Sequence, residues 1–245
     1  MIIRSIINWI LQKEKKYKHV HQDISWKEMF KIHNIPVEDL SEIKIASCYF
    51  KNIDSRIVEY QKKVFEKFNI PLEQHKINTS HGRFLTEYIN SNQNAKYFIF
   101  FDIDCIPTNP YAFIKILNDI ADENTLAGAI QTANHKQNGE NIYVGPSFMG
   151  FSQKLYKDIN IQTLEENENF DVGGIFTYLA LANNKYIKYW FPTSVKKPMW
   201  FLYPNSFFGI ETIYDGLIYH TFQIRLGRNT NKFIKHCKSV IKRYE

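Results

Sequence analysis

The sequence is poor in cysteine and contains no long apolar run. Its three cysteines, Cys48, Cys105 and Cys237, are far apart and odd in number, so neither a disulfide framework nor a zinc site is indicated. No stretch approaches the roughly 18–20 uninterrupted apolar residues of a membrane-spanning helix. The partly apolar N-terminus is interrupted by Arg4 and Asn8, and no signal-peptide cleavage pattern follows. We therefore expect a soluble, cytoplasmic protein.

The common phosphate-binding motifs are also absent. The chain has 10 glycines in 245 residues, and neither Gly-x-Gly-x-x-Gly nor Gly-x-x-x-x-Gly-Lys-Ser/Thr occurs, which argues against a dinucleotide fingerprint and a P-loop. Repeats, low-complexity tracts and linker-like segments are lacking as well, so we expect a single domain over residues 1–245. If this protein binds phosphate groups, a metal ion is the obvious way to hold them.

Positive charge is concentrated at the two ends of the chain. Residues 1–19 carry a net charge of +4 and residues 225–245 a net charge of +6, which leaves about −4 for the middle. Four isoleucines between positions 3 and 10 recur at helical spacing, which predicts a basic amphipathic helix. That helix either lies on an anionic membrane surface or packs against the domain. Neither end carries a nucleic-acid-binding motif, so we expect no nucleic-acid partner.

A buried strand leads directly into a pair of carboxylates. The run 97–101, Tyr-Phe-Ile-Phe-Phe, has no polar alternation, which is typical of a strand covered on both faces. Asp102 and Asp104 follow, and in an extended chain their side chains would share one face. A divalent cation between them would relieve their repulsion, because oxygen ligands suit Mg²⁺ and Mn²⁺. The alternative is a strand end whose acids cap a turn and face solvent.

Helical and strand-like segments alternate along most of the chain. Predicted strands cover 43–50, 70–78, 95–104 and 126–132, and predicted helices cover 55–69, 82–92 and 110–123. Further on, we predict a broken strand and a helix capped by Ser152 over 143–159. We also predict a helix and a strand over 169–192, joined by a turn at Asn183 and Asn184, and an apolar strand with His220 over 214–229. This pattern predicts an α/β fold, with a mostly parallel central sheet and helices on both faces.

This order of elements resembles the glycosyltransferases of the GT-A fold, a Rossmann-like architecture. The resemblance covers roughly residues 43–225 and is carried by the Asp-x-Asp at 102–104 and by a late histidine, His220. It implies a nucleotide-binding half over 43–132 and an acceptor half over 133–225. A short helical segment over 1–40 and the basic C-terminal segment would flank them.

The resemblance further implies a nucleotide-sugar donor and a divalent metal, Mn²⁺ or Mg²⁺. Asp102, Asp104 and His220 would hold the metal against the diphosphate of a UDP-, GDP- or dTDP-linked sugar. The implied acceptor is a hydroxyl of a glycan or glycolipid such as capsule or lipopolysaccharide, met in the cytoplasm or at the inner membrane face. The type of donor sugar, the acceptor, and inversion or retention at the anomeric carbon are left open.

Six other residues receive roles from this resemblance. Asp171 would take the proton of the acceptor hydroxyl, although an ordinary helix N-cap would equally favour an aspartate there. Residues expected near the nucleotide are Ser47, Tyr49, Asp54, His81 and Arg225. For Tyr49 the alternative is a ring that fills a strand end, for His81 an exposed loop histidine, and for Arg225 a simple part of the basic tail.

Two other classes of protein share parts of this pattern. A haloacid-dehalogenase-type phosphatase also ends a buried strand on Asp-x-Asp, but no convincing late acidic pair follows residue 104. A non-catalytic basic module that binds glycan, anionic lipid or nucleic acid would leave Asp102 and Asp104 as structural residues. Metal-dependent binding of a nucleotide sugar distinguishes the transferase from the binding module.

Overall fold

The structure is a computed structural model that describes residues 25–133, 141–203 and 205–245. The predicted basic amphipathic helix at the N-terminus lies outside the described residues. Of the predicted 1–40 segment, the described part contains α2 (Trp26–Ile32), and η1 (Leu40–Glu42) follows it. No helix in the described ranges is long and apolar enough to cross a membrane.

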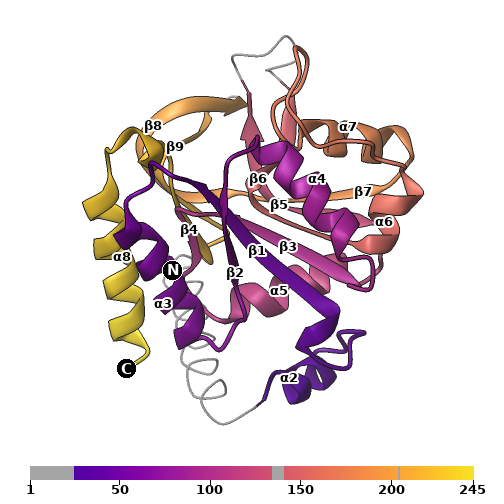
Figure 1. The fold of residues 1–245 in the computed structure, drawn as a ribbon, viewed down its shortest axis with the longest axis horizontal. Helices are drawn as coiled ribbons and strands as arrows, with labels where there is room; N and C mark the ends of the chain where they lie inside the picture. The colour runs from indigo at the N-terminus through magenta and orange to yellow at the C-terminus, as the bar shows by residue number, and fades with distance from the viewer. Residues whose placement is uncertain (1–24, 134–140, 204) are drawn as a thin grey trace, which may run out of the picture.

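A six-stranded sheet forms the centre of the molecule, with strand order β2-β1-β3-β6-β5-β7 (Figure 1). Its strands are β1 (Ile43–Phe50), β2 (Glu73–Ile77), β3 (Tyr97–Asp102), β5 (Thr125–Thr132), β6 (Ile142–Ser152) and β7 (Tyr186–Trp190). Strand β6 runs antiparallel to both of its neighbours, whereas the other pairings are parallel. The predicted α/β fold with a mostly parallel central sheet is therefore confirmed.

Helices cover both faces of this sheet. They are α3 (Ser55–Lys67), α4 (His81–Ser91), α5 (Tyr111–Ile120), α6 (Gln153–Asp158), α7 (Gly174–Ala182) and α8 (Thr230–Arg243). One apolar core joins α2, α3, α5 and α8 to the sheet, and a second core lies under α4, α6 and α7. Strand β3 supplies both: Tyr97, Ile99 and Phe101 enter the first core, and Phe98 and Phe100 the second. This explains why its sequence shows no polar alternation.

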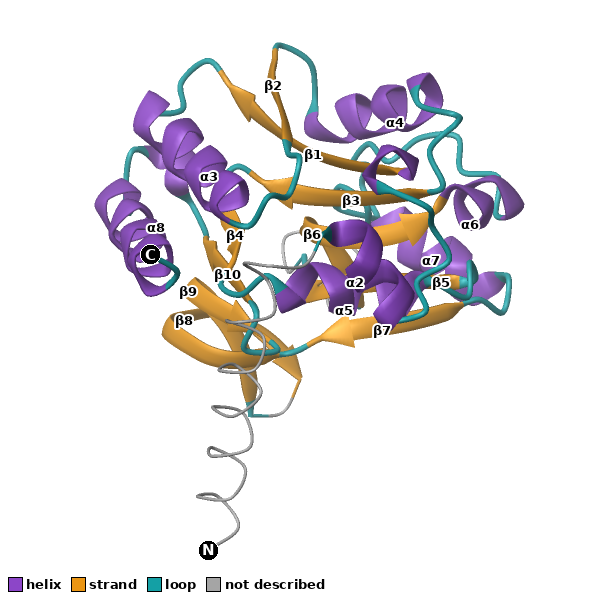
Figure 2. Cartoon of the chain, turned by 90° about the horizontal axis from the view of Figure 1, so that it is seen from below, coloured by secondary structure: helices purple, strands orange, loops and turns teal. Residues whose placement is uncertain are grey.

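A second, antiparallel sheet continues from the end of β3, with strand order β4-β10-β9-β8 (Figure 2). Its strands are β4 (Cys105–Pro107), β8 (Pro192–Tyr203), β9 (Ser206–Tyr214) and β10 (Ile218–Thr221), and η2 (Ile224–Leu226) follows β10. The β8–β9 pair is absent from the sequence-based prediction. Register shifts along this pair break the regular alternation of inward and outward side chains on which such a prediction depends.

The predicted strand over 95–104 is too long. The strand ends at Asp102, residues 103–104 form a turn, and β4 begins at Cys105. The sequence predicted that Asp102 and Asp104 share one face of an extended strand. This prediction is wrong, because Asp104 lies in the turn. The reason is that the chain leaves the main sheet here and pairs instead with β10, where Cys105 lies opposite His220.

Candidate functional site

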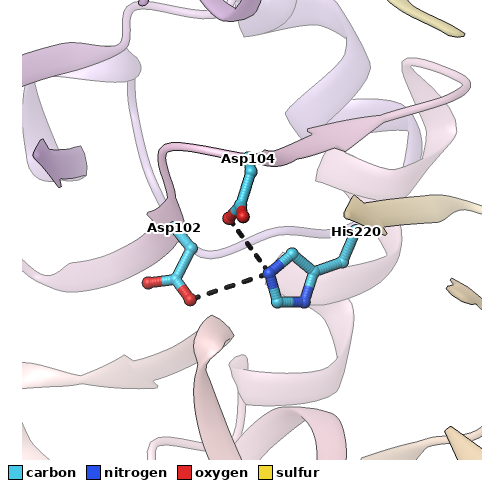
Figure 3. Close-up of side chains that lie close together, drawn as sticks. All are labelled: Asp102, Asp104 and His220. Carbon is cyan, nitrogen blue, oxygen red and sulfur yellow. Dashed lines mark hydrogen bonds and ion pairs between the residues drawn. The ribbon is translucent and has the colours of Figure 1, made fainter. Parts of the chain in front are cut away.

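Asp102, Asp104 and His220 form a compact cluster where the two sheets meet (Figure 3). Each contributes one ligand atom, and these atoms lie within 4.8 Å of one another. The Nε2 atom of His220 is 3.0 Å from Oδ1 of Asp104 and 3.8 Å from Oδ2 of Asp102. The structure thus brings together the three residues that the sequence analysis assigned to a metal, although His220 is 116 residues from Asp104 in the chain.

Backbone contacts fix the turn that carries the two aspartates. Gln61, buried in α3, donates from its amide to the carbonyl oxygens of Asp102 at 2.7 Å and Cys105 at 3.0 Å. The N–H of Thr221 donates to the carbonyl oxygen of Asp104 at 3.0 Å, which ties the turn to β10. The cluster is therefore held by both a helix and a strand, so its geometry does not depend on the three side chains alone.

The electrostatics of the cluster favour a bound cation. Burial raises the pKa of Asp102, and the neighbouring carboxylates of Asp104 and Asp171 raise it further, against the opposing effect of His81 and His220. A divalent ion would compensate this excess of negative charge. Two carboxylates suit Mn²⁺ or Mg²⁺, and Nε2 of His220, which faces both of them, would add a nitrogen ligand. The residues present therefore fit the implied metal.

The cluster lies in a cavity of about 930 Å³. This volume is near the upper end of the range of about 300–1,000 Å³ for small-molecule sites. The cavity is lined from β1 by Tyr49, from α4 by His81 and from η2 by Arg225. Asp171 lines it as well. Four residues that the sequence analysis placed near the substrates thus border the same space as the carboxylate–histidine cluster.

His81 stands next to the cluster because helix α4 begins at it. The side chain of Ser80 caps this helix by accepting from the N–H of Arg83, and Nε2 of His81 lies 3.7 Å from Oδ1 of Asp102. Gly82 lets the helix approach the segment before α7 closely, since a Cβ there would meet the carbonyl oxygen of Leu164 at 2.4 Å. His81 is therefore held in a helix that faces the cavity, and it is not a histidine of an exposed loop.

Two residues of the predicted nucleotide site do not line this cavity. Ser47 is buried within β1, and its hydroxyl has no partner in the described part of the chain. Asp54 caps α3 by accepting from the N–H of Arg56 and forms an ion pair with the Arg56 guanidinium at 2.6 Å. It borders a separate pocket of about 360 Å³. Their contact with a nucleotide stays a prediction.

Asp171 is held by two hydrogen bonds but does not cap a helix. The hydroxyl of Tyr143 donates to Oδ2 at 3.1 Å, and the N–H of Val172 donates to Oδ1 at 2.8 Å. The N-cap of α7 is Gly173, whose φ of 76° suits glycine. The interpretation of Asp171 as an N-cap is therefore wrong, because the chain makes a left-handed turn at Gly173 before the helix starts.

Several residues of the cavity wall were not predicted from the sequence. They include Gln131 at the end of β5, Tyr143 on β6, and the aromatic residues Trp200 on β8 and Phe208 on β9. An aromatic residue in an apolar stretch gives no local signal that separates a core position from a cavity wall. Tyr143 could have been suspected only through its pairing with Asp171, which lies 28 residues further along the chain.

No protein-family model matches this sequence, and no curated protein matches it either. Among solved structures, A197 from STIV is similar at a TM-score of 0.36 and 7% identity, over 59% of this chain and 80% of that chain. A protein assigned as a glucose-1-phosphate thymidylyltransferase from Bacillus anthracis, in complex with a sucrose, is similar at a TM-score of 0.37 and 10% identity, over 67% of this chain and 72% of that chain. The proposals below therefore depend on the site itself.

Proposed function

We propose that this protein is a metal-dependent glycosyltransferase that moves a sugar from a nucleotide-diphosphate donor to a hydroxyl of a glycan acceptor. The observation that carries this proposal is the convergence of Asp102, Asp104 and His220 at a large cavity that Asp171 also lines. Asp104 and His220 are buried and Asp102 is partly exposed, so two carboxylates lie close together in a largely buried place. Such a cluster costs stability unless a cation or a proton compensates it.

Asp102, Asp104 and His220 would hold the metal, Mn²⁺ or Mg²⁺. When bound, the ion would neutralise the diphosphate and make it a better leaving group. His81, 3.7 Å from Asp102, and Arg225, which lies next to the segment that follows β1, could contact the phosphates. There Nδ2 of Asn52 lies 3.4 Å from the carbonyl oxygen of Arg225. Tyr49, which also faces this space, would lie against the base.

Asp171 would act as the general base. An acceptor hydroxyl attacks the anomeric carbon of the donor sugar, a new C–O bond forms, and the bond from that carbon to the diphosphate breaks. The hydroxyl proton passes to a carboxylate oxygen of Asp171, and the products are the glycoside and the nucleoside diphosphate. Tyr143 and Val172 hold the carboxylate in one orientation, which keeps its remaining lone pairs available for the proton.

Thermal unfolding with nucleotides tests the binding part of this proposal. We expect one of UDP, GDP, dTDP or CMP to raise the melting temperature in the presence of Mn²⁺ and to have little effect with EDTA. Asp104→Asn should abolish the metal-dependent shift. Asp158→Asn is the matched control, since Asp158 pairs with Lys154 and Lys185 outside the cavity. A shift that is as large in Asp104→Asn as in the wild type would contradict the metal assignment.

The products distinguish this activity from its rivals. When the stabilising nucleotide is supplied as its sugar conjugate, a glycosyltransferase transfers the sugar to an acceptor, or more slowly to water, and releases the nucleoside diphosphate. A haloacid-dehalogenase-type phosphatase would instead release inorganic phosphate from a phosphate ester. Stabilisation by no nucleotide, with or without metal, would favour the non-catalytic binding module.

A further inference from the structure

The order of the strands in the main sheet defines two sides of the cavity. Strand β1 lies on one side of β3, and β6 and β5 lie on the other. Tyr49 enters the lining from the β1 side. Trp200 enters from the opposite side, because β8 contacts the end of β5, where the Thr132 hydroxyl donates to the carbonyl oxygen of Phe201 at 2.7 Å. The carboxylate–histidine cluster at the end of β3 stands between the two sides.

Three aromatic side chains form a wall on the β5–β8 side; we call Trp200, Phe208 and Phe222 the aromatic wall. The rings of Trp200 and Phe208 are stacked at 5.1 Å with an interplanar angle of 26°, and Phe222 lies 5.0 Å from Trp200 and 5.2 Å from Phe208. Phe222 also lies 3.8 Å from the ring of His220. The wall is thus continuous with the cluster, and all three of its rings border the cavity.

The polar groups on this side suit hydroxyl groups rather than phosphate. The side-chain amide of Gln131 donates to the hydroxyl of Ser147 at 2.6 Å. It also packs against Gly145, because a Cβ added at this glycine would come within 2.1 Å of Oε1 of Gln131. Asp171 and Tyr143 add a carboxylate and a phenol. The described lining of the whole cavity contains a single guanidinium, Arg225, and no lysine. The carbonyl oxygen of Arg225 lies by Asn52, on the β1 side, so among the described lining residues no lysine or arginine on the β5–β8 side would compensate a phosphate.

We propose that the β5–β8 side binds a neutral hexopyranose ring, stacked on Trp200 of the aromatic wall with a hydroxyl directed to Asp171. The C–H groups on one face of a pyranose carry partial positive charge and match the negative face of an aromatic ring. The fixed amide of Gln131 and the Asp171–Tyr143 pair would hydrogen-bond the ring hydroxyls. The assignment of this ring to the acceptor rests on the proposed function, since it places the acceptor hydroxyl beside the base.

Saturation-transfer NMR tests this proposal with the full-length protein. The probes are methyl β-D-glucopyranoside, methyl β-D-galactopyranoside and the methyl glycoside of N-acetylglucosamine, each with Mg²⁺ and with the nucleoside diphosphate that stabilises the protein. We expect saturation of the ring C–H protons of at least one probe. Trp200→Leu should weaken that sugar's binding about 3- to 10-fold, and Trp200→Phe should retain part of it.

Phe201→Leu is the matched control. Phe201 is the next residue on β8, is 49% exposed and does not line the cavity, so its replacement should leave the sugar signal unchanged. Equal saturation in Trp200→Leu and the wild type, or an equal loss in Phe201→Leu, would overturn the proposal. So would a wild type that binds the diphosphate but none of the sugars, and in that case the proposed function would stand. Sugar binding that depends on Trp200 in a protein that binds no diphosphate would support this site and refute the transferase.

Discussion

Single carboxylates in this protein take their properties from partners far away in the chain. Asp171 is oriented by Tyr143, and Asp102 lies between His81 and His220, which face its two oxygens at 3.7 Å and 3.8 Å. The sequence supplied the residue types at the cluster, and each of its three members was predicted. The sequence could not identify the partners of Asp171. The residues around position 171 are compatible both with a helix N-cap and with a hydrogen bond from a distant tyrosine.

The proposed role of Asp171 gives a prediction at the scale of one residue. Asp171→Asn should lower turnover of the nucleotide sugar by a factor of about 10² to 10⁴, because an amide cannot accept the acceptor proton. Binding of the nucleoside diphosphate with Mn²⁺ should change little. Steady-state kinetics and thermal shift, measured on the same preparation, separate the two effects.

Tyr143→Phe provides a graded comparison with this variant. It removes one of the two hydrogen bonds that orient the carboxylate and leaves the base in place, so its loss of turnover should be smaller than that of Asp171→Asn. Turnover of Asp171→Asn close to the wild type would show that another group accepts the proton.

Elements with a regular pattern of burial were predicted closely, and elements without one were not. The helix predicted over 55–69 is α3, Ser55–Lys67, and the strand predicted over 43–50 is β1 with the same bounds. Ser152 caps α6 as expected, accepting from the N–H of Leu155. The β8–β9 pair escaped prediction because bulges and a mostly exposed strand remove the alternation that marks a half-buried strand.

Helix α8 carries a titratable group that makes its docking depend on pH. His236 stacks on Tyr219 of β10 with ring centroids 3.6 Å apart and an interplanar angle of 4°. Burial and, to a lesser extent, the charges of Arg243 and Lys196 lower the pKa of His236 to about 4, against the opposing effect of Glu211. A depressed histidine pKa means that the unfolded chain takes up the proton more readily than the folded protein.

Stability should therefore be full above the ordinary histidine pKa of about 6.5 and be lost as the pH falls toward about 4. The loss attributable to His236 would reach up to about 3 kcal/mol in the free energy of unfolding. His236→Phe keeps the ring stack and removes the titration, so the drop between pH 7.5 and pH 4.5 should be smaller than in the wild type. Urea unfolding at the two pH values measures this. An identical drop in both proteins would show that His236 is not responsible.

At the scale of the whole molecule, the candidate metal cluster joins two sheets. Asp102 ends β3 of the main sheet, His220 belongs to β10 of the second sheet, and Asp104 lies in the turn between β3 and β4. A ligand that engages all three side chains links the two sheets directly. Without it, the sheets are connected near the site by the short turn at 103–104, by hydrogen bonds from Gln61 and Thr221, and by the hydrogen bond from Thr132 to Phe201.

Metal and nucleotide together should therefore protect both sheets from hydrogen exchange. We expect slower amide exchange in β10 and η2 as well as in β1 and β3 when Mn²⁺ and the stabilising nucleoside diphosphate are added. Asp104→Asn should remove this effect in both sheets, whereas Asp158→Asn should retain it. Protection confined to β1 and β3 would mean that His220 does not take part in binding.

The sequence by itself determined the local structure and the chemical types at the site. The apolar run 97–101 defined a strand covered on both faces, and Asp102 and Asp104 indicated a metal, because burial and ligand chemistry are properties of residues and short segments. The resemblance to GT-A glycosyltransferases added His220. Only the tertiary structure decided how these residues meet. The turn at 103–104, the pairing of β4 with β10 and the aromatic wall arise from contacts between distant parts of the chain. Local periodicity carries no information about which distant segment a strand pairs with.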